Sequence, residues 1–188
     1  TPSTHPLYWK RRSAPPKAID EKYDVIMVDA YQDITIPFQM SSVEFFTMVK
    51  EHLNENGVMV VNMNMRGNNE GNINQYLSDT IASVFDHIVT VDVDGSTNRE
   101  LYASSNADMV KTLENNANET GHSDLRDMML HVADTSSVYE AGDYIMTDDK
   151  APVELLGMQV IDQLIQGEVA YYKDIFEKDG INGLLESL

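Results

Sequence analysis

Four polar side chains follow a short apolar run near the start of the chain. The run of residues 23–28 ends on Asp29, and Tyr31, Gln32 and Asp33 come within the next four positions. A carboxylate placed directly after a buried strand lies at the edge where open α/β sheets bind ligands. There an ionised Asp29 can accept a proton or bind a cation. A turn-forming aspartate gives the same local pattern, so both interpretations stay open.

A second acidic pair, Asp148 and Asp149, precedes Pro152. Such a pair can bind a cation or an amine, but acids before a proline are also typical of a helix start, which we favour. No metal site is predicted, because the segment 92–95 lacks the spacing of a calcium loop and the five histidines show no metal-ligand spacing. The chain has no cysteine, which excludes disulfides, thiolate catalysis and cysteine-ligated zinc.

The segments around Asp29 predict a strand, a helix and a second strand. Residues 25–28 have the composition of a fully buried parallel strand, and residues 58–63 that of another. Between them, Ser41 and Glu44 have the spacing of a capping box, in which Ser41 bonds the Glu44 amide. The helix that follows is expected to close at Asn56 and Gly57.

The rest of the chain adds helices and a hairpin. Residues 73–85 predict an amphipathic helix, and strands at 87–93 and 99–104 flank the turn 94–98, which favours an antiparallel hairpin. Residues 106–134 should be helical, with an apolar face covering the sheet. A loop at 143–152 leads into a helix with a buried stripe, and a short helical tail follows from Tyr171 to Phe176 and beyond. The predicted fold class is α/β.

Composition limits the class of protein. The 188 residues suit one domain, and no segment approaches the roughly 20 apolar residues of a membrane helix. Residues 1–22 form an irregular basic arm, whereas the whole chain carries a formal charge of −18. Such a surface repels phosphate, which argues against a nucleic-acid partner. The absence of cysteine fits a reducing compartment, so we expect a cytoplasmic location.

Four motifs, taken in order, resemble those of the spermidine synthase-like family of polyamine aminopropyltransferases. They are Tyr-Asp-Val-Ile-Met-Val-Asp-Ala-Tyr at 23–31, Glu-Phe-Phe at 44–46, Gly-Val-Met-Val-Val-Asn at 57–62 and Thr-Asp-Asp-Lys-Ala-Pro-Val-Glu at 147–154. The resemblance places residues 23–188 in the carboxyl-terminal half of that family's class I methyltransferase-like domain. It implies a partial Rossmann-like sheet with flanking helices and a terminal antiparallel hairpin.

The resemblance also implies a reaction. Family members transfer an aminopropyl group from decarboxylated S-adenosylmethionine, a co-substrate, to an amine such as putrescine, with no tightly bound cofactor. Asp29 occupies the position of the carboxylate that orients the attacking amine and takes its proton. Tyr31, Gln32 and Asp33 would contact the amine, and Ala30 the co-substrate. A carboxylate suits this role because an ammonium group must lose a proton before it can attack.

The family pattern is not complete in this chain. Family members usually follow the catalytic strand with Asp, two small hydroxyl residues, Asp and Pro, whereas Ala30 and Tyr31 stand at the hydroxyl positions here and Asp33 comes one residue later. This is closer to relatives described only as synthase-like, so the sequence does not fix the acceptor amine.

The Gly-rich turn and the ribose-binding acid of the family's cofactor half have no counterpart, since the first glycine is Gly57. We therefore expect the chain alone to be inactive, and its sheet to be completed either in a homodimer or by a missing amino-terminal half. Two alternatives remain: an S-adenosylmethionine-dependent methyltransferase-like domain, and a non-catalytic oligomerisation module.

Overall fold

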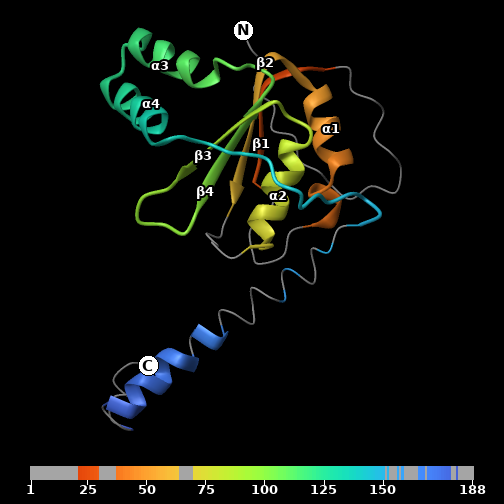
Figure 1. Cartoon of the computed structure of the whole chain (residues 1–188). Helices are drawn as coiled ribbons and strands as arrows, with labels where there is room; N and C mark the ends of the chain where they lie inside the picture. Colours follow the sequence, from red (N-terminus) through yellow and green to blue (C-terminus); the bar gives the residue numbers. More distant parts are fainter. Residues whose placement is uncertain are drawn as a thin grey trace.

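The α/β class is confirmed by a single five-stranded sheet (Figure 1). The computed structural model describes residues 21–29, 37–63, 70–150, 152, 156, 158, 165–167, 169–178 and 181, so most of the predicted basic arm lies outside it. The strand order is β1-β2-β4-β3-β5. The strands are β1 (Tyr23–Val28), β2 (Leu53–Met63), β3 (His87–Asp92), β4 (Arg99–Ser104) and β5 (Ser137–Val138).

The predicted strand-helix-strand unit is present, with one changed boundary. β1 and β2 pair in parallel, and α1 (Val43–Glu51) connects them after the short 3-10 helix η1 (Phe38–Met40). β2 begins at Leu53, so Asn56 and Gly57 lie inside the strand and do not close the helix, contrary to prediction. A Cβ at Gly57 would lie 2.9 Å from the Tyr23 carbonyl oxygen. The glycine is therefore needed where β2 passes the Tyr23 carbonyl of β1.

The start of α1 differs from the predicted capping box by one residue. Ser42, and not Ser41, is the N-cap, and its Oγ accepts a hydrogen bond from the Phe45 amide at 3.3 Å. The Glu44 side chain has another partner, because its Oε2 accepts the Asp148 backbone N–H at 3.0 Å. A segment far along the chain thus replaces the local reciprocal bond that defines a capping box.

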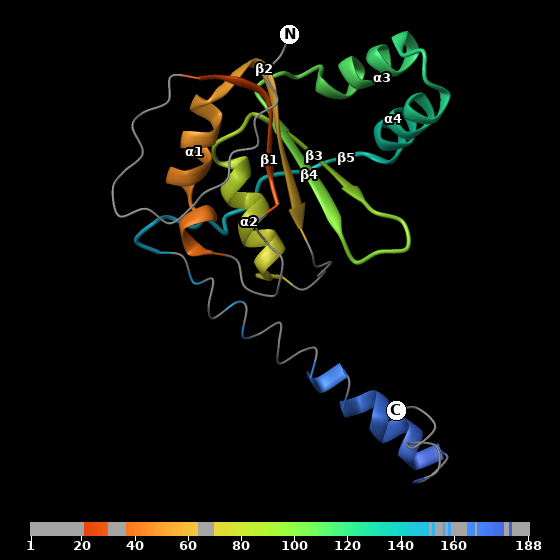
Figure 2. The same cartoon turned by 180° about the vertical axis from the view of Figure 1, so that it is seen from behind.

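The predicted antiparallel hairpin is confirmed, and the core lies on one side of the sheet. β4 pairs antiparallel with both β3 and β2, so it lies between them. α1 and α2 (Ile73–Ala82) pack on the same sheet face (Figures 1 and 2). The largest fully buried apolar side chains there include Phe46, Met59, Leu77, Ile81 and Leu101.

β1 is not the fully buried central strand that the sequence predicted. Val25 is 55% exposed and Met27 is 73% exposed, although Val28 is buried. Two causes combine: β1 lies at the edge of the described sheet, and α1 and α2 cover only one of its faces. We call the other face, which carries Val25, Met27, Val60, Asn62, Glu100 and Tyr102, the open face.

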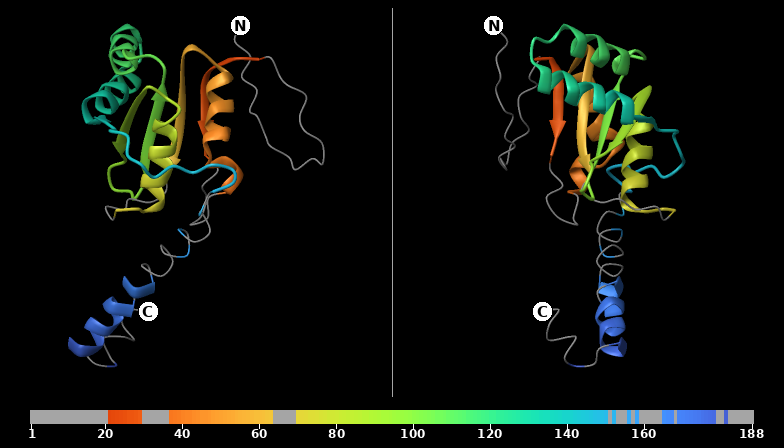
Figure 3. Two further views of the ribbon diagram at one scale, coloured as in Figure 1. Left: turned by 45° about the vertical axis from the view of Figure 1, so that its right-hand side comes forward. Right: turned by 90° about the vertical axis from the view of Figure 1, so that its left-hand side faces the viewer.

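The helices predicted in 106–134 exist, but they cover only part of the sheet. α3 (Met109–Glu119) and α4 (Ser123–Thr135) lie together on the side of the sheet opposite α1 (Figure 3), where α4 contacts β3. Their buried residues are Ala117 and Ala133, whereas Leu125 and Met128 are exposed. The two helices therefore pack mainly on each other.

Helical structure at 169–178 confirms the predicted tail around Tyr171 to Phe176, and it lies away from the sheet (Figure 3). Of the predicted apolar stripe before it, Leu156 is described and is buried, while the other positions lie outside the described residues. No helix among the described residues is long and apolar enough to cross a bilayer.

Residues 139–150, here called the strap, run across α2 toward the start of α1 (Figure 3). Asp79 on α2 is buried, and its carboxylate accepts three hydrogen bonds from the strap: from the Tyr139 hydroxyl at 2.6 Å, the Gly142 amide at 3.0 Å and the Tyr144 amide at 3.1 Å. Burial, and then this bond to Asp79, raise the pKa of Tyr139. A buried carboxylate with this many donors fixes the segment that supplies them.

The strap continues to α1 through Met146. Its amide donates to Thr80 Oγ1 at 3.0 Å, and its carbonyl accepts the Val43 amide at 2.9 Å. Because Val43 is the first residue of α1, the strap joins the two helices of the core face.

Replacing Gly142 with alanine should destabilise the protein through the strap. A Cβ at Gly142 would lie 2.5 Å from Asp79 Oδ2, so the carboxylate must leave its three donors. We expect the free energy of unfolding, measured by urea denaturation, to fall by about 2–4 kcal/mol. Gly121→Ala is the control, because no atom lies within 4 Å of a Cβ at Gly121. Equal stability of the two variants would contradict this role of Asp79.

Candidate functional site

Asp29 directly follows β1, at the edge of the sheet where α1 and α2 begin (drawn low in Figure 1). Because β1 and β2 are parallel, their carboxyl ends meet at this edge. Asp29 is exposed, and its Oδ1 accepts a hydrogen bond from Asn62 Nδ2, near the end of β2, at 3.3 Å. A carboxylate in this setting is open to a ligand and is held on one side by an amide.

Ala30, Tyr31, Gln32 and Asp33 lie outside the described residues, between Asp29 and Pro37. Their assignment to the amine and the co-substrate therefore stays a prediction. The same holds for the catalytic role of Asp29, although its position at the end of a parallel strand is as expected.

Two further polar residues, Asn62 and Glu100, stand beside Asp29; Asn62 ends the 57–62 motif but was given no role, and Glu100 belongs to none of the four motifs. Asn62 is paired with Glu100 in the antiparallel ladder of β2 and β4, so the two side chains share the open face. Burial raises the pKa of Glu100, and the negative charge of Asp29 raises it further. Asp29 and Glu100 are thus close enough to interact electrostatically, with Asn62 on the strand between them.

A signal for these two residues was present in the sequence. Asn62 is the polar residue that interrupts the apolar second strand, and Glu100 begins the last strand of the predicted hairpin. What was missing was the order of the strands, which puts β4 next to β2. Tyr102, two residues after Glu100 on the open face, is affected too: burial and then the Glu100 charge raise its pKa.

Asp148 has a structural contact at the start of α1. Its carboxylate accepts a hydrogen bond from Ser42 Oγ, and its amide donates to Glu44. The predicted role of the pair at the start of the helix after Pro152 stays a prediction, because residues 151 and 153–155 lie outside the described residues, and the contact that is described is with α1. Asp149 is exposed next to Asp148. The strap thus brings this acidic pair to α1, the first α-helix after Asp29 in the described part of the chain.

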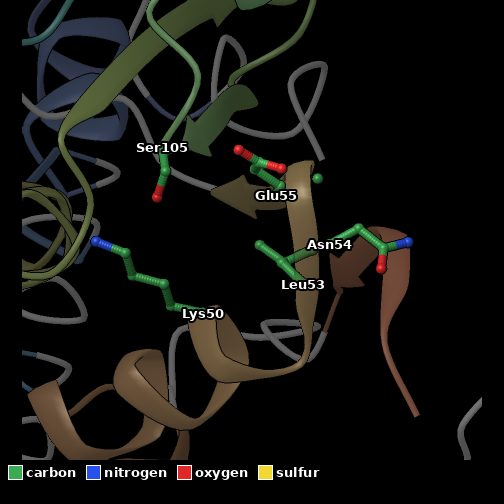
Figure 4. A pocket seen from close by; sticks show the side chains of 6 residues that line it. Lys50, Leu53, Asn54, Glu55 and Ser105 are labelled. Carbon is green, nitrogen blue, oxygen red and sulfur yellow. The ribbon is translucent and has the colours of Figure 1, made fainter.

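A hollow of about 260 Å³ lies at the other end of β2 (Figure 4). It is lined by Lys50, Leu53, Asn54, Glu55, Gly57 and Ser105. Lys50 is already occupied there, because its Nζ donates to the Val84 carbonyl at 2.7 Å and to Asp86 at 3.2 Å. The hollow is separated from Asp29 by the length of the strand. Within the described ranges, no cluster of three or more His, Cys, Asp or Glu side chains has the arrangement of a metal site.

The fold and the edge described above define a partial class I methyltransferase-like sheet, with β1 and β2 parallel and a terminal antiparallel hairpin. No family model matches the chain. A "Probable polyamine aminopropyl transferase" from Bifidobacterium longum is 52% identical over 91% of the chain. The resemblance to the spermidine synthase-like family is thus confirmed. The chain spans about 42% of that relative's length.

Two solved structures show partial similarity. The match to human methyltransferase-like protein 13 in complex with SAH covers 64% of this chain and 52% of the matched chain, with 17% identity and a TM-score of 0.42. The match to a "probable spermidine synthase" from Corynebacterium glutamicum covers 64% of this chain and 48% of the matched chain, with 19% identity and a TM-score of 0.34.

Removing the Asp29 charge should lower the pKa of Glu100. In Asp29→Asn the neighbouring negative charge disappears, but burial remains, so the pKa should stay above its ordinary value. A raised folded-state pKa means that the contribution of Glu100 to stability is present at low pH and is lost as the pH rises through that value. As the pH rises through the pKa of Glu100, the Asp29→Asn variant should therefore lose less stability than the wild-type chain. Carbon-detected NMR of the Glu100 carboxyl measures the shift.

Asp24→Asn is the control, because Asp24 lies at the opposite end of β1. If the pKa of Glu100 is the same in Asp29→Asn as in Asp24→Asn, then the carboxyl groups of Asp29 and Glu100 do not form one site.

Proposed function

We propose that this chain is part of an aminopropyltransferase that transfers from decarboxylated S-adenosylmethionine to an amine. The observation that carries the proposal is the combination of a relative at 52% identity with an exposed carboxylate, Asp29, at the carboxyl end of β1. The acceptor class is a small amine, and the sequence leaves open which one.

In the proposed reaction Asp29 binds the acceptor as a cation and then takes its proton. The freed nitrogen lone pair forms a bond to the aminopropyl carbon, the carbon–sulfur bond breaks, and its electron pair leaves with the sulfur of methylthioadenosine. The negative charge shared by Asp29 and Glu100 supports this role, because a cluster of one sign attracts a cationic substrate.

The co-substrate requires groups that this sequence lacks, since no Gly-rich turn precedes a helix. We infer that they come from another part of a longer protein, which pairs with the edge of β1 that has no partner strand among the described residues and covers the exposed Val25 and Met27. An uncovered strand edge and an apolar surface beside it favour association. A homodimer is the alternative. The cytoplasmic location also stays a prediction.

Asp29→Asn tests the chemistry. The test protein joins this chain to the part of the Bifidobacterium longum relative that it does not match, and is called the completed protein below. We expect its rate of aminopropyl transfer to putrescine and related amines to fall by about 100-fold or more, because general-base catalysis contributes on this order. Unchanged turnover would remove Asp29 from the mechanism.

The same protein separates the methyltransferase alternative. Tighter calorimetric binding of S-adenosylmethionine than of its decarboxylated form would favour methyl transfer, and the reverse order is the one we expect.

Hydrogen exchange tests the proposed contact at β1. In the isolated chain, the backbone amides of β1 that have no partner strand among the described residues should exchange fast. In the completed protein they should exchange at least about tenfold more slowly, because backbone pairing protects amides. β4 is the internal control, since it is paired on both sides in this chain. Light scattering on the isolated chain supplies the second readout: a dimer with protected β1 amides would favour the homodimer and contradict the proposal.

A further inference from the structure

Asn62 and Asp29 form a contact between neighbouring strand ends. The Asn62 amide donates to Asp29 Oδ1 at 3.3 Å. The position of Asn62 is fixed by the ladder, because β2 pairs with β1 on one side and with β4 on the other, where Asn62 faces Glu100. Asp29, in contrast, follows the last residue of an edge strand and is exposed. The fixed residue can therefore orient the less restrained one.

The orientation of the amide is set by its neighbours. Turning the Asn62 amide over would bring Oδ1 against the Asp29 carboxylate, which is unfavourable, so the donating nitrogen belongs on that side. The other atom, Oδ1, is buried and has no hydrogen-bond partner among the described residues. A buried amide is rarely left half satisfied unless the position serves another purpose.

We propose that Asn62 is a positioning residue for Asp29, which holds Oδ1 so that Oδ2 is presented to the attacking amine. The inference deepens the proposed function and rests on it. A free carboxylate at a strand end samples several rotamers, and a bond to one oxygen leaves the second oxygen in a defined direction. A proton acceptor held in this way contributes through orientation, to which reaction rates are steeply sensitive.

The chain contains a matched control for this contact. Asn54, also on β2, donates from Nδ2 to Asp24 Oδ1 on β1 at 2.6 Å. This is the same pair of residue types between the same two strands, but it lies at the opposite end from Asp29. A role in holding β1 to β2 would be shared by both asparagines, whereas a role in orienting the amine's base belongs to Asn62 alone.

The kinetic test compares Asn62→Leu, Asn54→Leu and Asn62→Gln in the completed protein. We expect Asn62→Leu to lower kcat by about 10- to 100-fold while the KM for the amine changes by less than about threefold, because orientation and not uniform binding is lost. Asn54→Leu should leave both constants unchanged, and Asn62→Gln should recover part of kcat, since it keeps the donor. Equal kinetics for the two leucine variants would overturn the proposal.

A second measurement on the chain as it stands needs no activity. The side-chain amide resonances of Asn62 should shift as Asp29 titrates, and the shift should vanish in Asp29→Asn. If the completed wild-type protein transfers no aminopropyl group, the proposed function fails, and the amide titration alone then decides whether Asn62 orients Asp29. Amide resonances that do not respond to the titration of Asp29 would contradict the contact itself.

Discussion

The parallel pairing of β1 with β2 is the constraint on which the rest of the structure depends. It puts the ends of both strands at one edge, so that a carboxylate after the first strand meets an amide near the end of the second. The pairing requires Gly57, because any side chain there would collide with the Tyr23 carbonyl. It also sets the role of α1, which must return the chain across the core face between the two strands.

The strap adds the second constraint, since it ties elements that are distant in the chain to that edge. Asp79 holds one part of the strap against α2, and Met146 and Asp148 bond the first turn of α1. In the sequence, α1 comes after Ala30, Tyr31, Gln32 and Asp33. The contacts of a helix start, which the sequence pattern assigned to local residues, are therefore partly supplied from more than 100 positions away. This gives the acidic segment 147–150 a structural role beside any catalytic one.

Elements with strong local signals were predictable, and their surroundings were not. The hairpin of β3 and β4 and the helices α2, α3 and α4 follow from periodicity and turn residues, which are local properties. The exposure of Val25 and Met27 could not be predicted from an apolar run, because such a run indicates only that burial of these side chains is favourable. Whether cover is present depends on other chain segments. Glu100 was missed for a related reason: its neighbour Asn62 lies on a strand that only the sheet order brings next to it.

The amine site that we propose lies at the carboxyl ends of β1 and β2, and a crystal structure of the completed protein with putrescine and methylthioadenosine would locate the bound amine. We expect an amine nitrogen within hydrogen-bond distance of Asp29 Oδ2, with Asn62 still bonded to Oδ1. An amine bound elsewhere, for example in the hollow beside Lys50 at the amino end of β2, with Asp29 facing only solvent, would contradict this proposal.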